Sequence, residues 1–390
     1  MGATIFENLF QYLAILLGSA GIIQGLITSI RQLGNALLNP VWGRLSDKLG
    51  RKRFLIFGNF FLSLNTLFLA NANSIVTLLV FLILHTIINA MIIPTWSGYL
   101  GDITSNYVRR RGAILGRLGM VVTLGSNIFL LFLMFFMDQN DPSRSSLHVL
   151  KIAFYFGSLA YFLAFLTAFK LPTLKNRRTP KKLFPSINLH KLDFPTPYKR
   201  LLILDSFFTL SWSLAWPLFP YITFDITTNW FQIGLLALVS AIFSAIGQFY
   251  GGKLVDLFGE KKMILFGRFF IIFPPLFFVL AETTHVLEFL YFSNMIVGLT
   301  LGASGLAIMT LILDSAPEEN RSTYQALYAM VTGLAAFLGS IFMGSVLQIL
   351  SGNIQPSIQL VIYLLVFVSL CRFIGWLGFW FLIEPEKHMH

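Results

Sequence analysis

Charged residues are scarce in this sequence. Asp, Glu, Lys and Arg together make up 12% of the chain, whereas hydrophobic residues make up 56%. A soluble domain of ordinary composition carries about 25% charged residues. So little charge cannot cover the water-facing surface of a 390-residue globule. The scarcity excludes an ordinary soluble protein and favours a chain whose main solvent is hydrocarbon.

Cysteine is nearly absent too, since Cys371 is the one residue of its type. A single cysteine excludes an intrachain disulfide, so cysteine usage says nothing about the redox compartment. No Lys or Arg precedes the first apolar run, so we expect no cleavable signal peptide. The sequence also lacks a nucleophile–base set, a phosphate loop and metal-ligand spacing. We therefore expect neither an enzyme nor a bound cofactor or metal.

Long apolar runs fill most of the chain. Each is close to the ~20 residues that a helix needs to cross a bilayer, and none alternates like a barrel strand. In lipid such runs must be helical, because the backbone has no other partners. We predict an all-α membrane protein with twelve transmembrane helices in two pseudo-symmetric six-helix bundles. The predicted spans, numbered 1 to 12, are 3–17, 20–43, 54–71, 75–101, 112–137, 149–171, 200–224, 231–252, 263–281, 285–314, 322–350 and 358–383.

The basic residues support this count. A net charge of +11 could indicate a nucleic-acid partner, but the Lys and Arg lie in short clusters between apolar runs. With the loop after span 2 placed inside, the inner connections and the C-terminus hold 22 of the 28 basic residues. The outer connections hold only Arg144 and Lys151. This asymmetry obeys the positive-inside rule. We expect no nucleic-acid partner, a cytoplasmic C-terminus and a place in the cell membrane.

One segment, 172–199, is rich in Pro, Lys and Arg instead of apolar residues. We predict that it is an inner basic linker between an N-terminal bundle, 1–171, and a C-terminal bundle, 200–390. Its charges are either solvated or held at the membrane surface.

The two predicted bundles repeat one motif. GRLSDKLGRKR at 43–53 and GKLVDLFGEKK at 252–262 share the pattern G-x-L-x-D-x-x-G-x-K-[RK] at an offset of 209 residues. The same offset aligns Leu9-Phe10 with Leu218-Phe219. It also aligns Met1 with Leu210, inside span 7, so span 1 is expected to be shortened by roughly two turns.

A doubled motif after spans 2 and 8 resembles the signature loop of the major facilitator superfamily, and the resemblance covers nearly the whole chain. It implies transport by alternating access, with Asp47 facing the start of span 11 and latching the outward-open state. Arg51 and Lys52 can reach Asp102 at the inner end of span 4. Alternatively, these residues are loop charges that only fix the topology. The predicted gating set is Gly43, Asp47, Gly50, Arg51, Lys52 and Asp102, with Gly252, Asp256, Gly259, Lys261, Asp314 and Arg321 in the second half.

Ionisable residues at membrane depth are functional candidates because burying them is costly. Glu7 in span 1 and Arg31 in span 2 both fall near the midplane and can pair. They form either a structural ion pair or part of a transport site, with Glu7 as the candidate for proton coupling. Asp205, near the inner end of span 7, is a second coupling candidate or is simply hydrated there.

The resemblance also implies a central cavity lined by spans 1, 4, 7 and 10. Trp212 and Trp216 can line such a cavity with their amphipathic rings, or they pack in the core. His85 likewise either lines the cavity or packs in the core. The implied substrate-binding set is Glu7, Gln11, Arg31, His85, Asn89, Trp212, Trp216 and Asn294.

We therefore expect a monomer in a lipid bilayer that transports a small-molecule or lipid-like substrate. The leading hypothesis is a secondary transporter of a small organic solute, with coupling to protons as a further hypothesis. The alternatives are a lipid flippase or scramblase and a non-transporting sensor, because a fold does not fix a function.

Overall fold

The described part of this computed structural model contains helices and no strands. The structure describes residues 1–19, 21–103, 111–140, 147–173, 194–315, 321–352 and 356–383, without the side chains of 47, 48, 101, 102, 111–117, 256 and 321–323. Contacts divide the chain into two compact units. Unit 1 comprises Met1–Ser19 and Ile30–Lys191, and unit 2 comprises Ala20–Ser29 and Leu192–His390.

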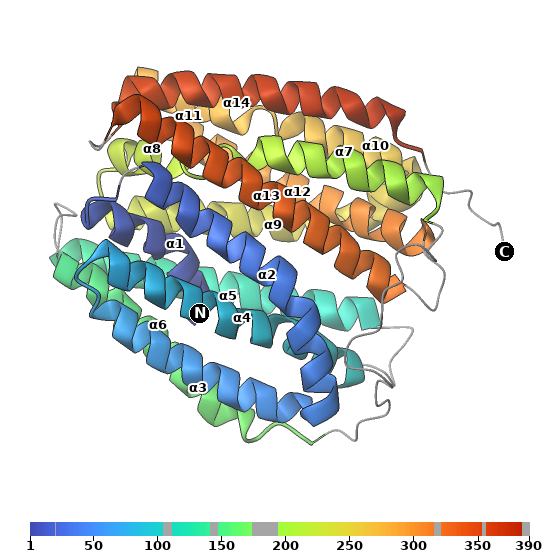
Figure 1. Cartoon of the computed structure of the whole chain (residues 1–390), viewed down its shortest axis with the longest axis horizontal. Coiled ribbons are helices and arrows are strands. Elements are labelled where there is room, and N and C mark those ends of the chain that lie inside the picture. The colour runs from blue at the N-terminus through green and yellow to red at the C-terminus, as the bar shows by residue number, and fades with distance from the viewer. Residues whose placement is uncertain are drawn as a thin grey trace. The chain divides into compact units, whose positions relative to one another are not determined.

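The first half of the chain forms six helices. Within unit 1, α6 packs against α1 and α3, and α3 also packs against α4 (Figure 1). The six helices are α1 (Gly2–Leu16), α2 (Gly21–Leu49), α3 (Arg51–Ala70), α4 (Ile75–Ile103), α5 (Arg111–Asn140) and α6 (Leu147–Ala168).

The second half has more helices because two of its spans are broken. Within unit 2, α9 packs along α12 and α13 packs along α7. The helices are α7 (Thr196–Ser213), α8 (Phe219–Ile226), α9 (Trp230–Phe258), α10 (Glu260–Phe270), α11 (Pro274–Thr284), α12 (Glu288–Ser315), α13 (Arg321–Ser351) and α14 (Ile358–Gly378), followed by the short 3-10 helix η4 (Phe379–Phe381).

Proline breaks the predicted spans 200–224 and 263–281, so their prediction as continuous helices is wrong. The first consists of α7 and α8, with Pro217 in the turn between them and Pro220 in the first turn of α8. The second consists of α10 and α11, where Pro274 and Pro275 open the second helix. A proline has no N–H to donate and its ring clashes with the preceding turn, which interrupts the helix.

With each broken pair counted as one crossing, the helices give twelve spans. In the described part of the chain, nine segments are long and apolar enough to be recognised as spans by composition alone. The other three are α1, which is 15 residues long, the polar α2, and the broken α7–α8. Large apolar side chains such as Val76, Phe132 and Tyr363 face outward, as a hydrocarbon solvent allows. The all-α membrane prediction is confirmed.

Glycines set the closest helix contacts. In unit 1, a Cβ on Gly34 of α2 would lie 2.3 Å from Cγ2 of Thr86 on α4. In unit 2, a Cβ on Gly298 of α12 would lie 2.3 Å from the carbonyl oxygen of Ser240 on α9. Small residues let membrane helices approach this closely, so residues next to Gly34 on α2 are brought against α4.

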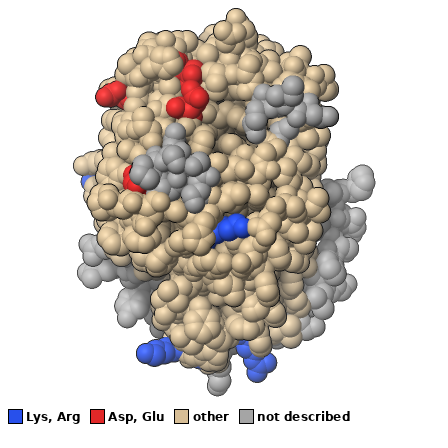
Figure 2. Space-filling model, turned by 90° about the vertical axis from the view of Figure 1, so that its left-hand side faces the viewer, with Lys and Arg blue, Asp and Glu red and all other residues tan. Residues whose placement is uncertain are grey.

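The two ends of unit 2 differ in charge. At the end reached by α8 and α11, Asp225 and Glu288 are exposed and Glu282 lies close to Asp225. Acidic side chains gather in the upper part of the view in Figure 2. The opposite ends of the same helix bundle carry Arg200 and Lys253, both exposed.

Candidate functional site

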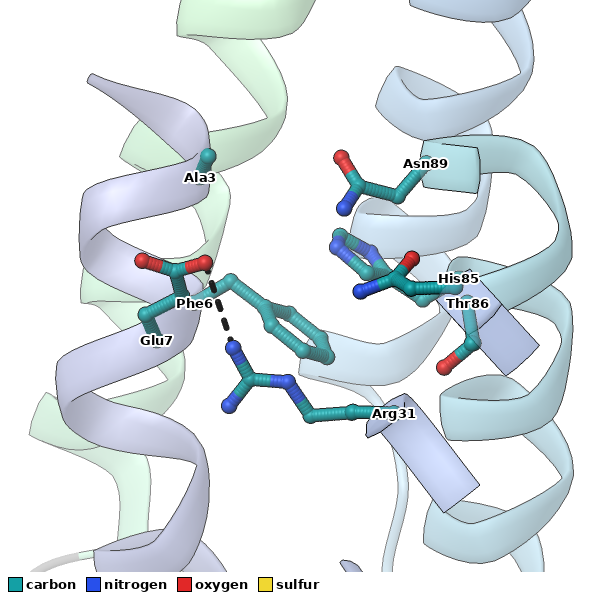
Figure 3. Close-up of a pocket in the computed structure, with 8 residues that line it drawn as sticks. Ala3, Phe6, Glu7, Arg31, His85, Thr86 and Asn89 are labelled. Atoms are coloured by element: carbon teal, nitrogen blue, oxygen red, sulfur yellow. Dashed lines mark ion pairs between the residues drawn. The ribbon is translucent and has the colours of Figure 1, made fainter. Parts of the chain in front are cut away.

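Unit 1 contains a polar pocket built by α1, α2 and α4. Its central feature is an ion pair between Nη2 of Arg31 and Oε1 of Glu7, 3.2 Å apart (Figure 3). The Glu7 side chain is 56% exposed and that of Arg31 is 25% exposed. The predicted pairing of these two residues is confirmed, and more than half of the Glu7 side chain is left uncovered by protein.

An aromatic stack supports this ion pair. The ring of Phe6 lies 3.5 Å from that of His85, centroid to centroid, with the two planes at 1°. The guanidinium of Arg31 sits over the same phenyl ring at 5.8 Å, a cation–π distance. In Figure 3, Phe6 projects from α1 toward His85 on α4, with Arg31 beside it. The charge of Arg31 is thus held by one carboxylate and one ring face.

The pocket also has polar atoms without partners among the described residues. Nδ1 of His85 and Oδ1 of Asn35 are buried and make no hydrogen bond. Asn89 lies on the wall beside them, whereas the Thr86 hydroxyl donates to the Leu82 carbonyl at 2.9 Å. The free space is about 10 Å³, which is about the room that one water needs. The pocket can hold a water and a proton, not an organic solute.

The sequence predicted some of the residues of this pocket and missed others. Of the predicted substrate-binding set, Glu7, Arg31, His85 and Asn89 lie together in this pocket. Gln11 is not among its lining residues. Phe6 was missed, and nothing distinguishes its ring in sequence from the other phenylalanines of the chain.

Unit 2 contains a second charged cluster at the wall of a larger cavity. Nη2 of Arg268 contacts Oδ1 of Asp205 at 2.5 Å, and the Tyr328 hydroxyl donates to the other carboxylate oxygen. Asp205 is only 1% exposed. The alternative that Asp205 is hydrated near the inner end of its helix is therefore wrong, because the carboxylate is buried and both of its oxygens are engaged by side-chain partners. Arg268 was missed as a partner, although a lone arginine in an apolar span is the signal that should have found it.

The cavity itself has a volume of about 250 Å³. Trp212, Arg268, Ser304, Gln325 and Tyr328 provide its polar and aromatic wall. The rest of its lining is Leu301, Gly305, Ile308, Met309 and Ile312.

Two predicted residues lie outside this cavity lining. Trp216 falls in the break after α7, with its ring packed edge-on against Trp212 at 5.4 Å. Trp212 and Trp216 do not lie on one continuous helix, because α7 ends at Ser213. Asn294 donates to the Leu290 carbonyl of its own helix at 2.9 Å and is also outside the lining.

A fully buried arginine joins the two breaks of unit 2. Arg372 on α14 donates from Nη1 to the Ile271 carbonyl at 2.8 Å and from Nη2 to the Trp212 carbonyl at 2.9 Å. In an unbroken helix, Ile271 would accept from residue 275, which is a proline without an N–H. Trp212 would accept from Trp216, whose N–H donates to Ser213 instead, so its carbonyl keeps only a longer backbone bond from Ala215 N–H at 3.4 Å. One guanidinium thus serves a carbonyl that one break leaves open and a carbonyl that the other break leaves weakly bonded.

The repeated motif forms the same local structure in both halves. Gly50 and Gly259, one offset apart, have φ of +100° and +85°, a region that favours glycine. Lys52 Nζ donates to the Phe169 carbonyl just after α6, and Lys261 Nζ donates to the Trp380 carbonyl in η4, both at 2.9 Å. Each lysine therefore ties the third span of its half to the end of the sixth, where a positive charge is favourable.

The predicted latches remain predictions. Arg51 donates to the Gly98 carbonyl of α4, one turn before Asp102. The side chains of Asp47, Asp102, Asp256 and Arg321 lie outside the described residues, and Asp314 is exposed. Of the remaining motif glycines, Gly43 faces Pro94 at 3.4 Å from its would-be Cβ, and Gly252 has open space around it.

Comparisons with known proteins agree with this architecture. The sequence profile of the Major Facilitator Superfamily matches residues 1–204 and again residues 201–390. An uncharacterized MFS-type transporter of Methanocaldococcus jannaschii is 24% identical over 359 residues, which cover 90% of this chain and 88% of that protein. A Na(+), Li(+), K(+)/H(+) antiporter of Planococcus maritimus is 29% identical over 138 residues, covering 34% of this chain and 32% of the antiporter.

A solved structure shares the fold. The crystal structure of a variant of the nucleoside transporter NupG superposes with a TM-score of 0.77 at 12% identity, covering 97% of this chain and 94% of that one. With the family profile matched across both halves, the chain belongs to the major facilitator superfamily.

Proposed function

We propose that this protein is a secondary active transporter that moves a small organic solute by alternating access and couples the movement to protons. The observation that carries the coupling is the Glu7–Arg31 pair at 3.2 Å. Its carboxylate is open to proton exchange while its cation is held by Phe6. A partial relative that is named as a proton antiporter supports proton exchange as well.

The chemistry of the pair is a competition. When Glu7 binds a proton, Arg31 loses its ionic partner and keeps only the ring of Phe6. Its guanidinium can then bind another acceptor, such as a water molecule in the space beside His85 and Asn89. Asp205 serves this role less well, since a sealed carboxylate cannot exchange protons without its cluster opening. We assign coupling to Glu7 and a structural part to Asp205.

Gating belongs to the repeated motif. Asp47 and Asp256 act as latches of unequal strength, because Glu260 replaces a basic residue in the second copy. The lysine contacts at Phe169 and Trp380 keep each motif loop fixed to its own half. The protein acts as a monomer.

The orientation follows from charge. The acidic end of unit 2, with Asp225 and Glu288, faces outside, and the end with Arg200 and Lys253 faces the cytoplasm, as the positive-inside rule requires. The C-terminus is then cytoplasmic and the membrane is the cell membrane.

Transport is tested with purified protein reconstituted into liposomes. A thermal-shift screen over solute classes identifies a ligand, because a bound ligand stabilises the folded state by mass action. Uptake of that labelled ligand into the vesicles is then followed. Accumulation above the outside concentration supports the proposal. Binding without accumulation identifies a sensor, and movement of labelled lipid between leaflets identifies a flippase or scramblase; either result contradicts the proposal.

A further inference from the structure

We infer that the cavity of unit 2 binds an uncharged amphipathic solute, with a flat apolar body and a carbonyl-type hydrogen-bond acceptor. The inference rests on the proposed function in that it names the class of solute that is moved. It depends on three features of the cavity wall: its unpartnered donors, its charge balance and its apolar surface.

Two buried donors of the wall have no partner. Nε of Arg268 and Nε2 of Gln325 are buried and have no hydrogen-bond partner among the described residues. Both residues line the cavity, one from α10 and one from α13. A buried donor without a partner is costly, and a ligand that offers an acceptor removes that cost at both atoms. A ligand group that only donates gains nothing at these two atoms.

The charges of the wall cancel. Arg268 is the one cation lining the cavity in the described part of the chain, and it contacts Asp205 at 2.5 Å. The second oxygen of Asp205 accepts from Tyr328. Asp205 is 1% exposed and is not part of the cavity lining, so a cationic ligand finds no exposed carboxylate there. An anionic ligand would approach a guanidinium whose charge is already neutralised and would meet the repulsion of Asp205. An uncharged acceptor fits best.

The rest of the wall is apolar. Trp212 contributes an indole, and Leu301, Ile308 and Met309 contribute aliphatic and thioether surface. A volume of about 250 Å³ suits a solute slightly smaller than the drug-sized ligands that fill pockets of about 300 Å³ or more. The position of Trp212 is fixed from behind, because Arg372 holds its carbonyl at 2.9 Å.

The test measures binding of four matched probes to the detergent-solubilised full chain by thermal shift. Benzamide carries an uncharged carbonyl, benzoate an anionic one, benzylamine a cation and toluene no polar group. We expect benzamide to give the largest stabilisation. Gln325→Glu keeps the size of the side chain but replaces its donor by an acceptor, and it should weaken benzamide binding by about tenfold or more.

Gln359→Glu is the matched control, since Gln359 is exposed on α14 outside the cavity. It should bind benzamide like the unchanged protein. Toluene, benzoate or benzylamine binding as well as benzamide would overturn the inference, as would a Gln325→Glu protein that keeps its benzamide affinity.

Failure of this inference can be told from failure of the proposed function. If vesicles accumulate a solute and Gln325→Glu leaves both binding and uptake of that solute unchanged, the cavity assignment is wrong while transport stands. If benzamide binding depends on Gln325 but no solute accumulates in vesicles, the assignment stands and transport is wrong.

Discussion

Two ion pairs at membrane depth differ in the exposure of their carboxylate side chains. Glu7 is 56% exposed in its pair with Arg31, whereas Asp205 is 1% exposed in its pair with Arg268. A partly exposed pair contributes little to stability, with a median of about 0–1 kcal/mol. Breaking a buried pair leaves a charge without compensation and costs about 3–5 kcal/mol. We therefore expect the carboxylate–arginine pair of unit 1 to take part in proton exchange and the pair of unit 2 to stabilise the fold.

Asp205→Ala should destabilise the protein by about 3–5 kcal/mol, because it leaves the Arg268 guanidinium buried without its carboxylate. Glu7→Ala, the matched change in the other pair, should cost about 1 kcal/mol or less. Unfolding of the purified protein in detergent measures both. The double variant Asp205→Ala with Arg268→Met should lose less than Asp205→Ala alone. An Asp205→Ala protein as stable as Glu7→Ala would contradict the assignment of a structural part to Asp205.

Some of these side-chain contacts could be predicted from the sequence and others could not. Glu7 and Arg31 were identified as partners because their depths in two neighbouring spans agree. The Asp205–Arg268 pair was not, since its members lie 63 residues apart and no short spacing relates them. The stack of Phe6 on His85 depends on the rotation of α1 about its axis, which tertiary packing decides.

At the scale of the helices, the breaks of unit 2 are held by Arg372. Arg372→Met should leave the Ile271 carbonyl buried without a donor, at about 1–3 kcal/mol, and should leave the Trp212 carbonyl with only its 3.4 Å bond from Ala215 N–H. Hydrogen exchange should rise in the two breaks, at 212–218 and 271–276, and stay low in the centre of α9. Arg372→Lys should recover only part of the loss, because an ammonium lacks the planar fork that serves two carbonyls.

The control for Arg372 is Arg200→Met. Arg200 is exposed and donates to a single carbonyl, that of Phe381, at 2.9 Å, which water can serve in its place. Exchange in the two breaks should not change in this variant. Equal exchange in the breaks of Arg372→Met and the unchanged protein would rule out the role of Arg372.

The α9–α12 contact offers a second test at this scale. Gly298→Ala places a Cβ 2.3 Å from the Ser240 carbonyl oxygen, so the helices must separate and the yield of folded protein should fall. Gly305→Ala on the same helix meets nothing within 4 Å and should be neutral or stabilising by up to about 1 kcal/mol. Size-exclusion chromatography after heating compares the two. A Gly298→Ala protein as heat-resistant as Gly305→Ala would contradict close packing at this glycine.

Helix number and type could be predicted from the sequence because apolar length and basic asymmetry are strong signals. The breaks were not predicted, although Pro217 and the Pro274–Pro275 pair are plain in the sequence. Prolines do occur within membrane helices, as Pro40 in α2 and Pro94 in α4 do here. Whether a proline bends or ends a helix depends on a partner for the freed carbonyl. In unit 2 that partner is Arg372, which lies about a hundred residues further along the chain.

At the scale of the whole molecule, a repeat of 209 residues organises the chain. It places a positive-φ glycine and a carbonyl-binding lysine at matching points of both halves. The functional groups do not follow the repeat. Unit 1 has an accessible carboxylate beside a space for about one water, and unit 2 has a sealed carboxylate beside a cavity of about 250 Å³. We interpret this as a division between proton coupling and solute binding.

The most direct test of this account is uptake of the identified solute into proteoliposomes under an imposed pH gradient, compared between the unchanged protein and Glu7→Gln. A gradient of about two pH units coupled to one proton allows at most about 100-fold accumulation. Glu288→Gln, at an exposed carboxylate outside the pocket, is the control and should accumulate solute normally. The account predicts that Glu7→Gln loses pH-driven accumulation but still exchanges labelled for unlabelled solute across the membrane. Accumulation by Glu7→Gln equal to that of the unchanged protein would contradict it.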